Sequence, residues 1–128
     1  MITLEPIAKG DLWPFPYFRL WETIFSGGRF KKQEIDIATD FTEIKFSSRH
    51  SDNQDDLNDH TKDDIYADMT IDSGGLVHYE WTSGDTDVIG RYQGRLVGIR
   101  NTGARPWHSK FWFEYWVVEQ SHYGRKTS

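Results

Sequence analysis

The chain has 128 residues, no cysteine, and a formal net charge of −5 that arises from 20 acidic and 15 basic residues. A chain of this length fits one domain of ordinary size, so we expect a single domain over residues 1–128. The absence of cysteine excludes disulfides, thiolate zinc sites and cysteine nucleophiles. The negative charge argues against nucleic acid as the main partner, because it would repel a phosphate backbone.

The first twenty residues predict neither a secretory signal nor a membrane span. They contain Asp11, Pro14 and Pro16 and no long apolar run. Together with the missing cysteines, this predicts a cytoplasmic protein with no membrane partner. A secreted chain whose signal has been removed would show the same features.

Alternation of apolar and polar residues, broken at short intervals by turn residues, predicts strands and no long helix. The expected strands cover residues 17–25, 30–38, 41–48, 65–71, 76–82, 88–100 and 110–119. Gly27 and Gly28 predict a tight hairpin turn between the first two strands, because glycine accepts positive φ. A short helix is the alternative for residues 17–25, since their apolar side chains also fit one helical face.

Residues 49–64 contain six Asp and two Asn and almost no apolar side chain. Such a segment cannot bury enough surface to order itself, which predicts a mobile acidic loop. It lacks the central Gly and closing Glu of an EF-hand calcium loop. Further along, Gly90, Gly94 and Gly98 recur within one expected strand, where they predict a bulge or a place for a large ring against the backbone.

Consecutive strands with short turns predict an all-β fold in which an antiparallel meander closes into a small β-barrel, since closure removes exposed edges. In this layout the chain is similar to small barrels of the lipocalin or allene oxide cyclase kind, a likeness of fold from which no function is taken. A two-sheet β-sandwich is the alternative. The last strand is apolar on both faces, so its outer face needs cover from the N-terminal segment or a second subunit. We therefore expect a homo-oligomer.

Three residues are candidates for acid–base catalysis. His78 and Glu80 project from the same face of one expected strand, where the carboxylate could raise the basicity of the imidazole. A plain solvent-facing pair is the alternative. Glu114 lies between Trp112 and Trp116, so it needs a partner such as an arginine, because an unpaired buried carboxylate is costly. Arg91, Arg95 and Arg100 are the candidates, and both a catalytic acid and a buried ion pair fit this pattern.

If these faces point inward, an aromatic pocket follows, with ligand-binding residues Tyr66, Asp68, Trp81, Trp112 and Trp116. The pocket predicts binding of a small hydrophobic molecule and, with the acid–base residues, a cofactor-independent isomerase, cyclase or lyase. The alternative function is a structural or interaction β domain with a filled interior that acts through homo-oligomeric assembly. His78, Glu80, His108 and His122 fit no metal motif, so we expect no metal and no cofactor.

Overall fold

The computed structural model describes residues 1–103 and 105–119. These form twelve strands, one short α-helix and one 3-10 helix. In chain order the elements are β1 (Ile2–Thr3), β2 (Ile7–Ala8), β3 (Tyr17–Arg19), β4 (Trp21–Ser26), β5 (Arg29–Glu34), α1 (Ile37–Asp40), β6 (Phe41–His50), η1 (His60–Lys62), β7 (Ile65–Asp68), β8 (Thr70–Ser73), β9 (Leu76–His78), β10 (Gly90–Arg100), β11 (Trp107–His108) and β12 (Phe113–Val118). The predicted all-β class is confirmed.

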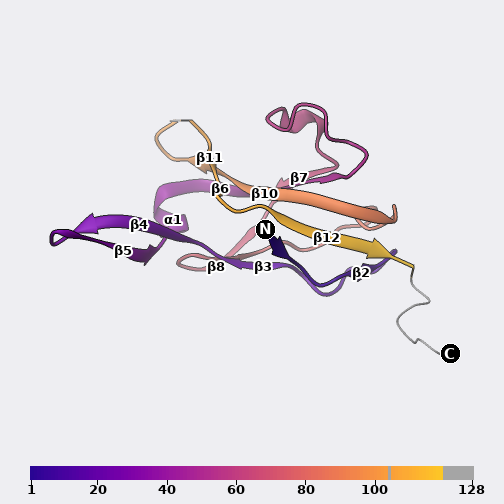
Figure 1. Cartoon of the computed structure of the whole chain (residues 1–128), viewed down its shortest axis with the longest axis horizontal. Coiled ribbons are helices and arrows are strands. Elements are labelled where there is room, and N and C mark those ends of the chain that lie inside the picture. Colours follow the sequence, from indigo (N-terminus) through magenta and orange to yellow (C-terminus); the bar gives the residue numbers. More distant parts are fainter. Residues whose placement is uncertain (104, 120–128) are drawn as a thin grey trace.

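The strands form three sheets (Figure 1). The main sheet has the order β1-β12-β10-β6-β7, with β2 added beside β12 and β11 beside β10. A second sheet has the order β3-β9-β8, and β4 and β5 form a separate two-stranded hairpin. No closed barrel is found among the described residues, so the predicted barrel is not confirmed. The main sheet is also not a simple meander, because β1 and β2 run parallel to β12 and because β6 pairs with the distant β10.

Four expected strands either divide in two or end early. The strand expected over 17–25 divides at the buried Leu20 into β3 and β4, and the strand expected over 65–71 divides at the buried Met69 into β7 and β8. In both cases the two halves belong to different sheets. The strand expected over 30–38 ends at Glu34, before a helix capped by Asp36, and that over 76–82 ends at His78. The alternation of apolar and polar residues continues through these strand ends, because it reflects which side chains are buried and not which strands pair.

Aromatic rings fill the space between the main sheet and the three-stranded sheet. Phe46 has no exposed surface, and its ring stacks on Tyr79 at 4.5 Å and on Phe113 at 4.9 Å between centroids. Tyr115 is equally buried and shares a 2.7 Å hydrogen bond with the Ser48 hydroxyl. Large aromatic rings thus fill core volume for which this chain has few aliphatic side chains.

Two glycines of β10 make room for these rings. A side chain on Gly94 would collide with the Ser47 carbonyl and the Phe113 ring, and one on Gly98 would collide with the Phe41 ring. The expected close approach of rings to the backbone is confirmed at both positions.

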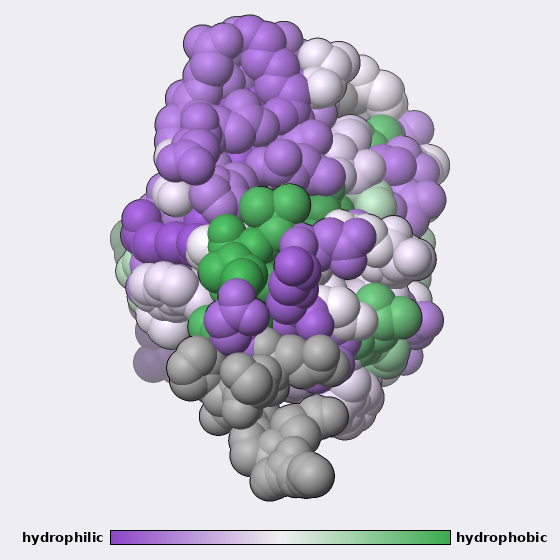
Figure 2. All heavy atoms as spheres, turned by 90° about the vertical axis from the view of Figure 1, so that its right-hand side faces the viewer, coloured by the Kyte–Doolittle hydropathy of each residue, from purple (hydrophilic) through white to green (hydrophobic). Residues whose placement is uncertain are grey.

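The acidic loop lies over part of the outer face of the main sheet, which we define as the side away from the three-stranded sheet (Figure 1). Figure 2 shows it as a hydrophilic projection at one end of the molecule. Arg49 of β6 fastens it, with hydrogen bonds to Asp63 and to the carbonyls of Asp55, Asp56 and Asp59. Mobility of the segment stays a prediction.

The described part of the chain contains no helix that is both long and apolar enough to cross a membrane.

Candidate functional site

The β4–β5 hairpin extends from the body of the protein as a two-stranded ribbon (Figure 1). Its turn has φ values of +62° at Gly27 and +81° at Gly28, which confirms the hairpin expected there. Residues directly opposite each other in an antiparallel pair share a face. One face therefore carries Trp21, Thr23, Phe25, Phe30, Lys32 and Glu34, and the other carries Glu22, Ile24, Ser26, Arg29, Lys31 and Gln33.

The first of these faces is aromatic and uncovered. Trp21 is 51% exposed, Phe25 64% and Phe30 74%, although rings of this size normally contribute most to a core when buried. Phe25 and Phe30 touch only edge to face at the tip, with 5.0 Å between centroids. A projecting ribbon with an uncovered aromatic face is typical of an interaction site.

A groove of about 550 Å³ lies at the root of this hairpin. Its walls are largely aromatic and aliphatic, and Arg19, Glu22 and Lys110 add charge. The lining residues are Ile2, Tyr17, Phe18, Arg19, Leu20, Trp21, Glu22, Thr23, Ile35, Trp107, Lys110 and Phe111. Because Trp21 and Thr23 belong to both features, the groove continues the aromatic face of the hairpin.

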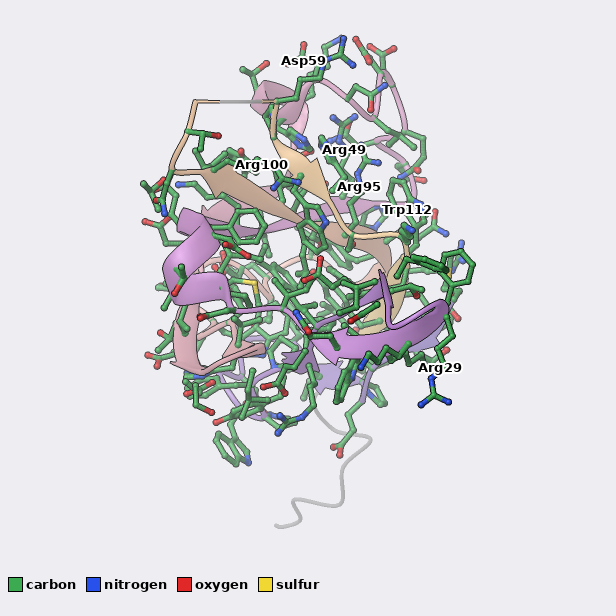
Figure 3. The ribbon with its side chains drawn as sticks, turned by 90° about the vertical axis from the view of Figure 1, so that its left-hand side faces the viewer. Arg29, Arg49, Asp59, Arg95, Arg100 and Trp112 are labelled. Atoms are coloured by element: carbon green, nitrogen blue, oxygen red, sulfur yellow. The ribbon has the colours of Figure 1, made fainter. Side chains whose placement is uncertain are left out.

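Charge is unevenly distributed along the hairpin. Arg29, Lys31 and Lys32 lie on β5 toward the tip and form no ion pair with any described residue. Arg29 points away from the body in Figure 3. At the root, a hydrogen bond from Arg19 and one from the Gly75 backbone hold the pKa of Glu34 below its usual range, so Glu34 stays ionised. Glu22 is also at the root and has no ion-pair partner in the described part of the chain.

His78 and Glu80 come together as expected, but in a closed cluster. The Nε2 atom of His78 lies 2.8 Å from Glu80 Oε2, and its Nδ1 atom lies 2.7 Å from Asp72 Oδ2. The rings of Phe15 and Tyr17 stack on the two sides of the imidazole. Burial lowers the pKa of His78, but the hydrogen bonds to the two carboxylates outweigh it and the net pKa is raised. Both ring nitrogens are engaged, so neither is available to a substrate.

Glu114 has the arginine partner that the sequence demands. Arg91 donates from Nε and Nη2 to Glu114 Oε1 at 2.9 and 2.7 Å, and Thr3 donates to Oε2 at 3.0 Å. These bonds, that of Arg91 first, hold the pKa of Glu114 below its usual range. A carboxylate kept ionised in this way suits an ion pair better than a proton donor.

The five residues expected to line one pocket do not come together: Trp81 lines a cavity of about 290 Å³ beside residues 14–17, and the other four lie elsewhere. Trp81 is buried in the core and donates to the Pro14 carbonyl at 2.8 Å. Tyr66, Asp68, Trp112 and Trp116 are spread along the outer face of the main sheet. There Tyr66 stacks on His60, Asp68 pairs with Lys45, and Trp112 and Trp116 lie under Arg95 and Arg91. Arginine side chains thus supply the cover that the last strand needs on its outer face.

The hairpin face and its groove are absent from the sequence-based site. The sequence did contain a signal for the hairpin face. Strands that flank a two-glycine turn pair residue by residue, which places Phe25 opposite Phe30. The sequence contained no such signal for the groove, because residues 107–111 are far from the hairpin in sequence and only the tertiary structure brings them to it.

No known protein family, curated protein or solved structure matches the chain. Within residues 1–103 and 105–119, no group of three or more His, Cys, Asp or Glu side chains is arranged to hold a metal ion.

Proposed function

We propose that the chain is an interaction domain that self-associates, with the hairpin tip of one copy in the groove of a second copy. The observation that carries this proposal is the uncovered aromatic face of β4–β5. Burying that face against a partner removes apolar surface from water, at roughly 25 cal/mol per Å². This function corresponds to the structural or interaction role considered as the alternative from sequence.

A second copy is the partner whose chemistry fits best. The tip offers the two rings of Phe25 and Phe30, and the groove is walled by Trp21, Trp107 and Phe111. Of the groove's charged residues that form no ion pair with a described residue, Glu22 would attract the cationic tip and Lys110 would repel it, so we place Arg29 of the tip beside Glu22. The same chain therefore carries both halves of the contact. If each copy inserts its tip into the other, the contact closes as a two-fold dimer, which is the commonest symmetry of soluble oligomers.

The first test removes the rings of the tip. Sedimentation velocity over a micromolar range of concentrations should show dimers for the natural chain and monomers for a Phe25→Ser, Phe30→Ser double variant. Since both rings are exposed, the unfolding midpoint should change little. Trp13→Ser is the matched control, because Trp13 is 67% exposed but lies outside the hairpin and groove. A natural chain that stays monomeric, or a double variant that dimerises equally well, would contradict the proposal.

The second test exchanges charges between tip and groove. Arg29→Glu alone and Glu22→Arg alone should each weaken dimerisation about 5- to 30-fold, because two exposed ion pairs become repulsive contacts. An equimolar mixture of the two variants should recover dimers, since both contacts are then attractive again. Weakening without recovery in the mixture would show that these residues do not face each other.

A second candidate function rests on the size of the groove. Its volume of about 550 Å³ lies within the range of roughly 300–1,000 Å³ for small-molecule sites. Such a site would take a small aromatic or apolar molecule, the ligand class expected from sequence. The tip variants distinguish the two functions, because they remove dimers but leave the groove intact. Acid–base catalysis gains no support, since His78 and Glu114 are held by oppositely charged side chains and neither residue lines the groove.

A further inference from the structure

Two histidines join the acidic loop to the main sheet. His60 begins η1 within the loop, and His108 ends β11, which pairs with β10. Their Nε2 atoms lie 3.2 Å apart with 5.5 Å between ring centroids, so the rings point end to end. The contact is an N–H···N hydrogen bond, in which one hydrogen lies between the two nitrogens.

The other contacts of His60 hold its ring in place. Asp63 Oδ2 lies 2.9 Å from His60 Nδ1 and also accepts a 2.7 Å hydrogen bond from the Ser47 hydroxyl. Arg49 donates to the other oxygen of this carboxylate, and Tyr66 stacks on the imidazole at 4.8 Å between centroids. The carboxylate keeps a hydrogen on Nδ1 of His60, so only the Nε2 atom can exchange its hydrogen with His108.

The surroundings of His108 oppose a positive charge on its ring. Burial, the cation of Arg95 and then the neighbouring His60 lower the pKa of His108. No carboxylate of the described residues lies within ion-pair distance of His108, in contrast to the histidines of the loop and of β6. Arg95 itself is held close, because it donates to Asn58 of the loop at 2.9 Å. His108 is therefore neutral near neutral pH.

We propose that the His60–His108 pair is an acid-sensitive latch, which ties the acidic loop to β11 near neutral pH and releases it in mild acid. With no charge or one charge on the pair, a single hydrogen lies between the Nε2 atoms and the bond persists. When both rings are protonated, each Nε2 carries a hydrogen and the bond is lost. Two imidazolium ions then face each other beside Arg95, and their repulsion separates the two segments.

The other ionisable side chains around the pair do not replace this effect. Asp63 is balanced by Arg49, and burial raises the pKa of the Tyr66 phenol, which stays neutral. In the open form the pKa of His108 returns to about 6.5, so the open form binds the extra proton more readily. Opening therefore increases as the pH falls below about 6.5, by at most tenfold per pH unit for one proton. The latch does not depend on the proposed dimer.

Hydrogen exchange of the full chain between about pH 7.5 and 5.5 tests the latch, with rates corrected for the intrinsic pH dependence of exchange. Opening of residues 58–64 and 107–109 should increase about 3- to 10-fold from pH 7 to pH 5.5. This increase should disappear in His108→Gln, whose side chain cannot be protonated. His50→Gln is the matched control, because His50 also contacts the loop, through the Asp52 backbone, but lies outside the pair. It should keep the increase.

A titration of the natural chain keeps the test independent of how well the variants fold. Histidine side-chain NMR should show that the His108 ring becomes protonated only below pH 6.5, together with the loss of exchange protection. Protonation of His108 without any increase in opening would overturn the proposal. So would an increase that persists in His108→Gln or one that disappears in His50→Gln, since another group would then sense the pH.

Discussion

His78 illustrates how a pair of residues with catalytic chemistry can serve the fold instead. Its side chain is 8% exposed and lies between two aromatic rings, with a carboxylate at each nitrogen. Asp72 comes from β8 and Glu80 from the segment after β9, so the imidazole links β9 to β8 and to the chain that follows β9. We therefore expect the protonated ring to help hold β8 and β9 together.

We predict a pH-dependent contribution of His78 to stability. Because its pKa is raised on folding, the stabilisation is fully present below the unfolded value of about 6.5 and is lost as the pH rises through the folded value. The free energy of unfolding of His78→Gln should therefore fall furthest below that of the natural chain near pH 6 and approach it toward pH 9. Urea unfolding at several pH values measures this difference. A difference that stays constant with pH would refute the role of the charge.

At the scale of elements, the acidic loop depends on one buried arginine. The side chains of Arg49 and Asp63 are 3% and 1% exposed, and the three carbonyls that Arg49 also binds all belong to the loop. Figure 3 places Arg49 on the sheet beneath the loop that carries Asp59. A segment too polar to order itself is thereby given a fixed anchor.

Replacing this anchor should release the loop. Arg49→Met leaves the Asp63 carboxylate buried without its cation, which should cost about 3–5 kcal/mol in the free energy of unfolding. Hydrogen exchange over residues 51–64 should accelerate. Lys62→Met is the control, because the exposed Lys62–Asp55 pair should contribute less than about 1 kcal/mol. Equal exchange rates in the natural chain and Arg49→Met would show that other contacts hold the loop.

At the scale of the whole molecule, one set of aromatic rings fills the core and a different set would form the proposed dimer contact. The rings around Phe46 fill the core, whereas those of the hairpin remain in solvent. Phe46 and Phe30 are the same residue type at 0% and 74% exposure. Their substitutions should therefore have opposite consequences.

Phe46→Ala should lower the free energy of unfolding by about 3–5 kcal/mol, because it removes the ring at the centre of the core and leaves a cavity. Phe30→Ala should change it by less than about 0.5 kcal/mol but weaken dimerisation. Urea unfolding at low protein concentration and sedimentation velocity measure the two quantities. A large loss of stability in Phe30→Ala would mean that the hairpin is part of the core of the single chain.

Local sequence chemistry alone determined the all-β class, the Gly27-Gly28 hairpin and the need of Glu114 for an arginine. Each of these depends on backbone freedom, on side-chain alternation, or on the cost of an unpaired charge, all of which a short segment reveals. The tertiary structure decided that Leu20 and Met69 end one strand and begin another, and that Trp81 enters the core. It also decided that His60 meets His108. These outcomes depend on which distant strands pair, and alternation carries no information about the pairing partner.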